Sequence, residues 1–375
     1  REPEIHILGH ETQEAVLQEW GVWLYDALVL LVPTDASLGG ITMTELEDFL
    51  DSGRSLFLVT DSDAPVPMAS IMQRAGVTRD PPGMKVVDHQ RYHTALGGIH
   101  TVVAADAFAP SPVTGPTARD SFFLFQGSGM AIDPKSRSLF PCLRAPASTY
   151  TAAKPGDAKQ RRTGGEIALA ACMDARAGGR AVFIPSTEVL SNRFFQANVQ
   201  LPDGTTKAAA ANRAFSKDLL AWAFKEKGML RASEVKHWKV GGEQQDVYKI
   251  KDHIGFSMQI EELQGGEWVP FQGEDVQVEY RMLDPYVRKT LKHDGKGTFS
   301  TEFQSPDVYG VFKFQVEYQR AGYNLLHLEE MAPLRPFKHN EYERFIPAAY
   351  PYYVGVFTSM LGFLGFSLAM LYSKF

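Results

Sequence analysis

The run Asp26-Ala-Leu-Val-Leu-Leu-Val-Pro33 is an unbroken apolar segment that ends at a turn residue. A strand of a parallel sheet has this pattern, because helices cover it on both faces. Further along, Thr42-Met-Thr-Glu45 offers Thr42 or Thr44 as a helix cap, with acidic residues in the first turn. The two segments together predict a strand followed by a helix, the repeating unit of an α/β fold.

The same alternation continues through the first half of the chain. The predicted helix carries an apolar stripe, Leu46, Phe49 and Leu50, and ends at Gly53. The pattern then predicts strands over 55–60, 100–105, 122–125 and 179–184, a helix over 66–75 that Gly76 ends, and a helix over 208–227. We therefore expect residues 1–230 to form an open, mostly parallel sheet with helices on both faces.

The pattern changes near Leu230. Short segments that alternate apolar and polar residues follow, including Phe256–Glu261, Val276–Tyr280 and Val311–Tyr318. The pairs Gly241-Gly242, Gly265-Gly266 and Asp294-Gly295 are turn signals between them. Residues 231–332 are predicted to form an antiparallel β-sandwich.

A membrane helix is predicted at the C-terminal end, over residues 352–373, after a juxtamembrane segment over 333–351. No charged residue occurs from Val354 to Tyr372, and such a run crosses most of a ~30 Å hydrocarbon core. The aromatic side chains that flank it are predicted interface anchors: Tyr350, Tyr352, Tyr353, Tyr372 and, before them, Phe345.

The span also carries small residues on one helical face, Gly355, Ser359 and Gly362, which predict close packing of a partner helix. Lys374 follows the span, so we expect a short cytosolic C-terminus and an ectodomain on the other side of the membrane.

Composition excludes several classes of protein. With 38 basic and 44 acidic side chains the net charge is -6, a poor match for nucleic acid. The basic cluster Lys159–Arg162 lies in a polar stretch typical of a solvated loop. Two cysteines, Cys142 and Cys172, are too few for a zinc module, and their spacing leaves a disulfide and two free thiols equally open. Arg1–Glu4 is not a signal sequence, and no glycosylation sequon occurs.

Few residues suggest chemistry. Gln126-Gly-Ser-Gly129 follows a predicted strand, but the helix that a phosphate loop or a nucleophile elbow requires is missing from the pattern. Cys142, Cys172 and Ser128 therefore lack the setting of a nucleophile. Asp88, His89 and His93 could hold a metal or supply a base, yet a structural role is favoured, and no further ligand is evident near them. No catalytic, cofactor or metal site is predicted.

The last hundred residues are the most distinctive. The segments Ser305–Tyr323 and Tyr342–Tyr353 resemble the wheat-germ-agglutinin-binding-protein type subunit of the eukaryotic oligosaccharyltransferase complex. Shorter matches lie upstream, over residues 24–26, 51–56, 87–89, 129–133, 222–228 and 284–288. The resemblance therefore covers essentially the whole chain from Glu4. Compared with the family, a signal peptide, a first strand and helix, and a basic tail are missing. We expect the sheet to expose an edge where that strand would lie.

The resemblance implies a non-catalytic scaffold subunit of the endoplasmic-reticulum membrane, single-pass type I, with its ectodomain in the lumen. A many-span subunit of that complex transfers a dolichyl-diphosphate-linked glycan to Asn in sequons. Implied partners are that subunit, the other subunits, membrane lipid and the lipid-linked donor, with no nucleic acid and no cofactor. The implied N-terminal fold is glutamine-amidotransferase-like or flavodoxin-like. Trp238 and Trp268 are candidate sugar-stacking residues, although core packing is favoured for both.

Two other hypotheses are kept. The first is a free-standing type I membrane receptor or adhesion protein, which the small-residue face of the span fits less well. The second is an amidotransferase-like hydrolase that uses Cys142 or Ser128. Loss of an ectodomain activity in Cys142→Ala or Ser128→Ala would support it.

Overall fold

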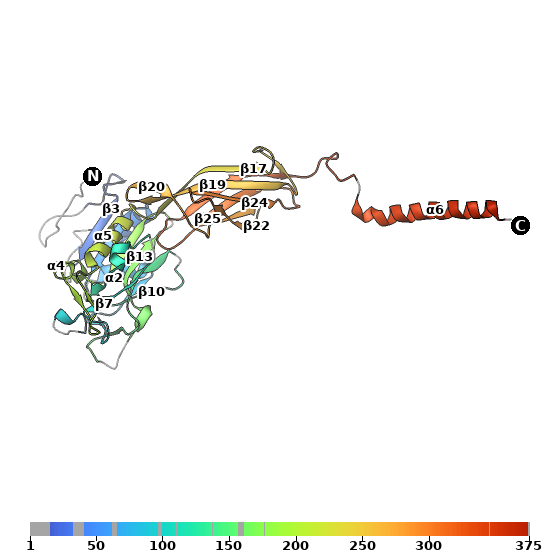
Figure 1. The fold of residues 1–375 in the computed structure, drawn as a ribbon. Helices are drawn as coiled ribbons and strands as arrows, with labels where there is room; N and C mark the ends of the chain where they lie inside the picture. The colour runs from blue at the N-terminus through green and yellow to red at the C-terminus, as the bar shows by residue number, and fades with distance from the viewer. Residues whose placement is uncertain are drawn as a thin grey trace.

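The chain is elongated, with two folded blocks followed by an isolated helix (Figure 1). The computed structural model describes residues 16–32, 41–61, 66–96, 100–109, 112–136, 138–156, 161–175, 177–344 and 346–373. Strands and helices up to residue 223 form the first block, and strands from residue 229 onward form the second. Phe345, Lys374 and residues 159–160 of the predicted basic loop lie outside the described residues.

Three parallel strands form the centre of the first block. Strand β3 (Ala27–Val32) pairs in parallel with β4 (Ser55–Thr60), and β4 pairs in parallel with β14 (Arg180–Ile184). Helix α1 (Met43–Asp51) lies between β3 and β4 in the chain, and α2 (Val66–Arg74) follows β4. These elements confirm the strand–helix alternation that the sequence predicts.

Helix α1 begins and ends where its residues require. Thr42 is the N-cap: its hydroxyl accepts from the Glu45 N–H at 3.3 Å, and the Glu45 carboxylate accepts from the Thr42 N–H at 2.7 Å. Leu46 and Phe49 are buried. Gly53 has φ +85°, and a Cβ there would lie 2.6 Å from the Ala177 carbonyl oxygen, so only glycine fits.

The remainder of this sheet is antiparallel, which corrects the prediction of a mostly parallel sheet. The strand order is β3-β4-β14-β13-β10-β5, and β11 pairs with β13 and β8. A tight turn explains the change of direction, because the Ala175 N–H donates to the Gly179 carbonyl at 2.8 Å and strands joined so closely must run antiparallel. The added strands are β5 (Val77–Arg79), β8 (Ala107–Phe108), β10 (Met130–Ile132), β11 (Leu139–Arg144) and β13 (Ala168–Asp174).

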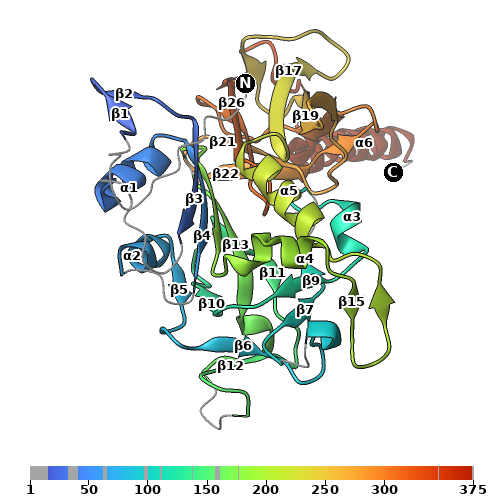
Figure 2. The ribbon, with the colours of Figure 1, turned by 90° about the vertical axis from the view of Figure 1, so that its left-hand side faces the viewer.

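Helices cover both faces of this sheet, as predicted (Figure 2). Side chains of β4 alternate between two cores: Leu56 and Leu58 pack with residues of α1 and α2, whereas Phe57 and Val59 pack with residues of α5 (Asn212–Ala223). Among the described strands β3 is the last on its side, and its Val29 and Leu31 are exposed.

Shorter elements complete the first block. They are β1 (Gln18–Glu19), β2 (Val22–Trp23), β6 (Lys85–Val87), β7 (Val103–Ala105), α3 (Pro116–Arg119), β9 (Phe123–Phe125), β12 (Tyr150–Ala152), α4 (Asn192–Phe195), β15 (Val199–Gln200) and β16 (Thr206–Lys207). Strand β7 is shorter than predicted, because the carbonyls of His100 and Val102 accept from the loop at 88–93 instead of from a neighbouring strand. Helix α5 is also shorter, because Lys225 adopts φ 62° soon after its end.

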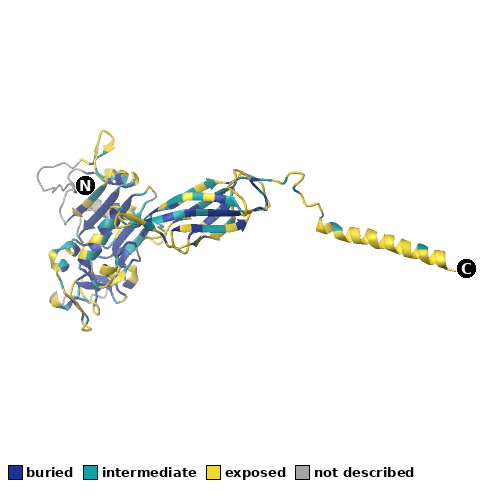
Figure 3. Cartoon of the chain, turned by 45° about the horizontal axis from the view of Figure 1, so that its top comes forward, coloured by how far each residue is buried: buried dark blue, intermediate teal, exposed yellow. Residues whose placement is uncertain are grey.

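The second block consists mainly of two antiparallel sheets around one core (Figure 3). The first contains β17 (Met229–Lys239), β19 (His253–Gln264), β20 (Glu267–Pro270), β23 (Lys292–His293) and β24 (Thr298–Gln304). The second contains β21 (Gln277–Arg281), β22 (Pro285–Thr290), β25 (Lys313–Tyr318) and β26 (Leu326–Met331). A small parallel pair joins β18 (Tyr248–Lys249) and β27 (Leu334–Arg335). Alternate side chains of these strands, such as Phe256 and Phe314, enter the core, which is the predicted period-two pattern.

Helix α6 (Tyr350–Tyr372) follows a linker and lies apart from both blocks (Figure 1). It is the one helix among the described residues that is long and apolar enough to cross a membrane. At a rise of 1.5 Å per residue it measures about 34 Å, which matches a hydrocarbon core. Its apolar side chains are exposed, so no part of the two blocks covers them.

Candidate functional site

The two cysteines are joined in a disulfide, which answers the question that the sequence left open. Cys142 on β11 and Cys172 on β13 have Cα atoms 5.7 Å apart and are both fully buried. A disulfide sulfur is not a free thiolate nucleophile. The hydrolase hypothesis that uses Cys142 is therefore wrong for this oxidised form of the chain.

Ser128 is equally unsuited to be a nucleophile. Its side chain is fully buried, and strand β10 follows it rather than a helix. Gly127 packs closely against the segment that follows β14, where a Cβ on residue 127 would lie 2.7 Å from the Pro185 carbonyl oxygen. The Ser186 hydroxyl donates to the Gln126 carbonyl at 2.5 Å. The segment Gln126–Gly129 is thus a close-packed connection rather than a phosphate cradle.

The Asp88–His93 segment has structural contacts. The Asp88 carboxylate accepts four hydrogen bonds at 2.7–2.9 Å, from the N–H groups of Gln90 and Arg91 and the hydroxyls of Ser148 and Thr149. These contacts saturate the carboxylate and fix the loop.

The two histidines point to separate partners. His89 is hydrogen-bonded to the Tyr150 hydroxyl at 2.8 Å, while His93 Nδ1 accepts from the Gln200 N–H at 3.2 Å. Burial lowers the pKa of His93, so the ring favours its neutral form. Within the described ranges, no group of three or more His, Cys, Asp or Glu side chains is placed to hold a metal ion.

Neither tryptophan proposed for sugar stacking lies in a core cluster, so the favoured core role is wrong for both. Trp238 packs across the strand from Gly255, where a Cβ would lie 2.4 Å from the indole ring. Trp268 is 37% exposed, and the Arg231 guanidinium lies 4.2 Å from the centroid of its ring. An arginine therefore occupies one face of Trp268, which a sugar would have to displace or complement.

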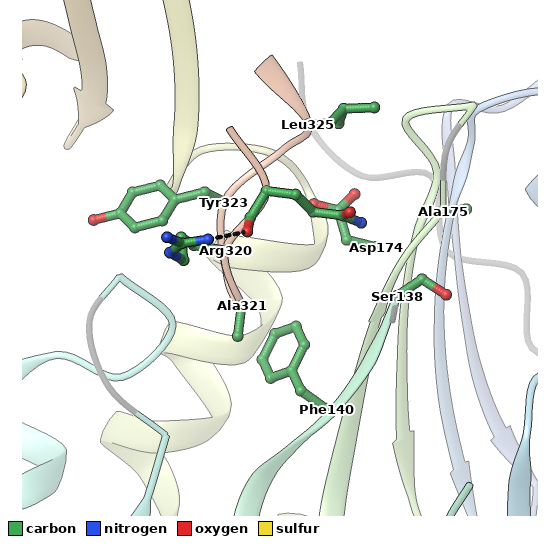
Figure 4. A pocket seen from close by; sticks show the side chains of 9 residues that line it. Ser138, Phe140, Asp174, Ala175, Arg320, Ala321, Tyr323 and Leu325 are labelled. Atoms are coloured by element: carbon green, nitrogen blue, oxygen red, sulfur yellow. Dashed lines mark hydrogen bonds between the residues drawn. The ribbon is translucent and has the colours of Figure 1, made fainter. Parts of the chain in front are cut away.

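A pocket of about 260 Å³ opens where the two blocks meet (Figure 4). Ser138, Phe140 and Asp174 line it from the first block, and Arg320 and Tyr323 line it from the second. The sequence patterns did not indicate this site, because its walls come from segments far apart in the chain.

The polar groups of this pocket are not arranged for catalysis. Arg320 Nε donates to Asp275 at 2.6 Å, so its charge is already paired. Ser138 Oγ lies 3.5 Å from Ser136 Oγ rather than against a base. Asp174 Oδ2 is buried without a hydrogen-bond partner among the described residues. This oxygen is not accessible from the pocket, so it does not provide a hydrogen-bond acceptor for a molecule bound there.

Burial sets the charge state of the groups beside the pocket. Desolvation raises the pKa of Asp174 to about 6, although the positive charges of Arg180 and Lys225 oppose the shift. Arg180 faces Asp174 across the β13–β14 pair, and burial lowers its pKa to about 10. Both groups are charged at neutral pH, in the wall between the two blocks.

Apart from Phe345, which lies outside the described residues, the predicted anchors and packing residues of the membrane span lie on α6. Tyr350, Tyr352 and Tyr353 are exposed in its first turn, and Tyr372 is exposed at its other end. Gly355, Ser359 and Gly362 share a helical face, and the Ser359 hydroxyl donates to the Gly355 carbonyl at 2.8 Å. That bond satisfies the hydroxyl within its own helix, so Ser359 needs no partner from another helix. The anchoring and packing roles remain predictions.

Comparison with known proteins assigns the chain to a family. The OST48 N-terminal domain matches residues 1–226, and the OST48 middle domain matches residues 236–374. The dolichyl-diphosphooligosaccharide–protein glycosyltransferase 48 kDa subunit of Arabidopsis thaliana is 38% identical over 372 residues, which cover 97% of this chain and 85% of the relative. The subunit of Danio rerio is 35% identical over 368 residues (96% and 83%), and that of Caenorhabditis elegans is 33% identical over 386 residues (99% and 85%). The chain therefore belongs to the OST48 family, the family of these 48 kDa subunits.

Proposed function

We propose that this protein is a non-catalytic scaffold subunit of the oligosaccharyltransferase complex of the endoplasmic reticulum. Its role is to support the en bloc transfer of a dolichyl-diphosphate-linked glycan to Asn in sequons. The observation that carries this proposal is the match to the 48 kDa subunits over almost the whole chain, with both OST48 domains in order.

The chemistry of the described residues supports a non-catalytic role. The candidate nucleophiles are a disulfide sulfur and a fully buried serine, and the candidate Asp is saturated by four hydrogen bonds. The hydrolase alternative loses its proposed residues. The receptor alternative has no support from the relatives, whose names describe a subunit of a glycosyltransferase.

We also propose a domain division and a membrane topology for the chain. Residues 1–230 form a flavodoxin-like, glutamine-amidotransferase-like domain, and residues 231–332 form a β-sandwich; the parallel strands β3, β4 and β14 and the two sheets around one core support this division. The juxtamembrane segment 333–351 leads to a membrane helix over 352–373. The helix inserts as a type I span, with both domains in the lumen.

The proposed partners follow from membership of a complex. The many-span catalytic subunit and other membrane subunits pack on the face that carries Gly355, Ser359 and Gly362, and Tyr350, Tyr352, Tyr353 and Tyr372 anchor the helix in lipid. The lumenal domains help to position the lipid-linked donor. The pocket between the blocks is too small for a whole oligosaccharide, so a donor contact would involve an open surface.

Purification in mild detergent tests the proposal. The full chain is pulled down from membranes, and the eluate is assayed for glycan transfer to a sequon peptide. We expect activity and a many-span subunit to co-purify, and the chain alone to be inactive. Transfer by the isolated chain would overturn the non-catalytic role. Elution as a lone polypeptide without activity would overturn membership of the complex and favour the receptor hypothesis.

A further inference from the structure

Exposed apolar side chains gather at the end of the second block from which the chain leaves for α6. We call this the exit end, and define it as the loops 240–252, 282–284 and 305–312 with residues 331–342. The strand pairing places these loops together: Lys239 pairs with Ile254, Arg281 pairs with both Pro285 and Lys313, and Lys313 pairs with Met331. Each pair lies at the same end of its strands.

The apolar side chains at this end are unusually accessible. Leu283 is 82% exposed, Met331 73%, Val311 67% and Tyr309 65%. Other exposed apolar side chains lie beside them: Val240, Val247, Tyr286 and Val308. Single exposed apolar residues are ordinary. A group of exposed apolar side chains on the loops of one end instead indicates a surface that contacts a membrane or another protein.

Several charged groups at the exit end are paired with one another. Lys239 donates to Asp252 at 3.0 Å, and Lys251 lies 2.9 Å from Asp307. Three further carboxylates, those of Glu243, Asp246 and Asp284, lie in the loops of this end, so acidic side chains slightly outnumber basic ones. Such an end suits a zwitterionic surface better than an anionic one.

The linker holds the exit end close to the start of α6. The Arg335 guanidinium makes two hydrogen bonds to Glu341, at 2.6 and 2.8 Å, and the rings of Phe337 and Tyr342 are 5.4 Å apart. Lys249 lies 5.4 Å from the ring centroid of Phe337, so the chain as far as Tyr342 is fastened to the exit end. From Tyr342 to Tyr350 even a fully extended chain reaches at most about 28 Å.

We propose that the exit end rests on the surface of the bilayer that α6 enters, with Leu283, Tyr309, Val311 and Met331 in the headgroup region. This inference rests on the membrane insertion of α6 under the proposed function. Apolar and tyrosine side chains on loop tips favour the boundary between headgroups and acyl chains. The ectodomain then has two attachments to the membrane, the helix and the exit end. Two attachments limit its tilt and fix the height of the first block above the bilayer.

Depth-dependent quenching tests the contact. The full chain, with Leu283→Cys or Met331→Cys, is labelled with an environment-sensitive fluorophore and reconstituted into phosphatidylcholine vesicles that contain nitroxide-labelled lipid. The native cysteines do not react, because they are disulfide-bonded and buried. We expect several-fold stronger quenching at both positions than for Glu267→Cys, a matched exposed position at the opposite end of the same sheets.

A label at Leu364→Cys in α6 distinguishes membrane insertion of the helix from contact of the exit end with the bilayer. If that label is quenched but labels at 283 and 331 behave like the one at 267, the helix is inserted and the exit-end proposal is wrong. If the label at 364 is not quenched, membrane insertion itself fails. Quenching by aqueous iodide tests a third outcome. If iodide quenches the labels at 283 and 331 in vesicles that hold the chain alone, but not in the assembled complex, a protein subunit covers this end instead. That result also overturns the proposal.

Discussion

The guanidinium of Arg180 lies 4.6 Å from the ring centroid of Trp222 and donates to the carbonyl of the same residue at 2.8 Å. It also donates to the carbonyls of Lys227 and Gly228, at 2.7 and 2.8 Å. The Trp222 indole N–H donates to Gly322 in the second block at 2.7 Å. One buried arginine therefore joins β14, the end of α5 and the segment that enters the second block.

Replacement of this arginine should destabilise the junction strongly. Arg180→Met keeps most of the side-chain volume but removes three hydrogen bonds from a charged donor, and the Lys227 carbonyl loses the arginine altogether. The carbonyls of Trp222 and Gly228 still accept from the N–H groups of Lys225 and Asn324. A hydrogen bond to a charged group contributes about 1.5–3 kcal/mol, so we expect a loss of about 3 kcal/mol or more in the free energy of unfolding. Thermal or urea unfolding of the purified chain measures it. Arg213→Met, at an exposed position on α5, should change stability by less than about 0.5 kcal/mol. Equal effects of the two substitutions would contradict the role of the buried arginine.

Asp174 should make stability fall as the pH rises from about 4 to 6. Burial raises its folded-state pKa to about 6 from an ordinary value of 3.8, so in this window the folded state binds more protons than the unfolded state. The contribution is complete below the unfolded pKa and is lost as the pH passes the folded pKa. The shift corresponds to about 3 kcal/mol at most. Asp174→Asn should remove this dependence and raise stability at pH 7 relative to the native chain.

Glu341 provides a control of opposite sign. Hydrogen bonds from Arg335 lower its pKa to about 2, so its contribution is present above the ordinary pKa of 4.5 and is lost as the pH falls. The difference in unfolding free energy between each variant and the native chain is measured from pH 3 to 8. The effect of Glu341→Gln should shrink toward low pH, whereas Asp174→Asn should gain stability as the pH rises. A pH-independent difference for Asp174→Asn would mean that its pKa is not raised.

The disulfide should contribute substantially to stability. It closes a loop with a sequence separation of 30 residues, for which the chain-entropy model gives about 3.5 kcal/mol. Cys142→Ala together with Cys172→Ala should lower the free energy of unfolding by about that amount. Because both cysteines are fully buried, alkylation after reduction should need denaturant. Rapid alkylation of the native chain without denaturant would show that the bridge is accessible or unformed.

The sequence predicted local elements better than their assembly. The pattern around Thr42 and Gly53 located α1 closely, because a capping box and a stop glycine act within a few residues. The period-two segments of the second block are also strands in the structure. The prediction of a mostly parallel sheet was wrong, because the antiparallel strands β5, β8, β10, β11 and β13 were not among the predicted strands. The antiparallel pairing of β13 with β14 depends on a turn that no pattern of apolar residues reveals.

The candidate site residues show the same contrast between features of one segment, which the sequence predicts, and features assembled from distant segments, which it does not. The membrane helix was predictable because its length and lack of charge are properties of one continuous segment. The junction pocket, the Asp174–Arg180 pair and the exit end bring together residues that are distant in sequence. An isolated arginine or aspartate carries no signal of its burial, so these features required the structure.

The small-residue face of α6 should determine how the chain joins its complex. Gly355→Leu with Gly362→Leu adds large side chains on the predicted packing face, where a Cβ meets nothing within the chain itself. The isolated chain should therefore fold and insert normally, while a partner helix can no longer approach. We expect reduced co-purification of membrane subunits and reduced sequon transfer in the eluate.

Ser367→Leu is the matched control, because it enlarges a small residue on a different face of the same helix. If both changes reduce co-purification equally, the helix responds to bulk in general and the face is not specific. If neither has an effect, the helix serves as an anchor and assembly depends on the two folded blocks. Loss confined to the Gly355 and Gly362 variant is the result that the packing prediction requires, because only that face lets two helix backbones come close together.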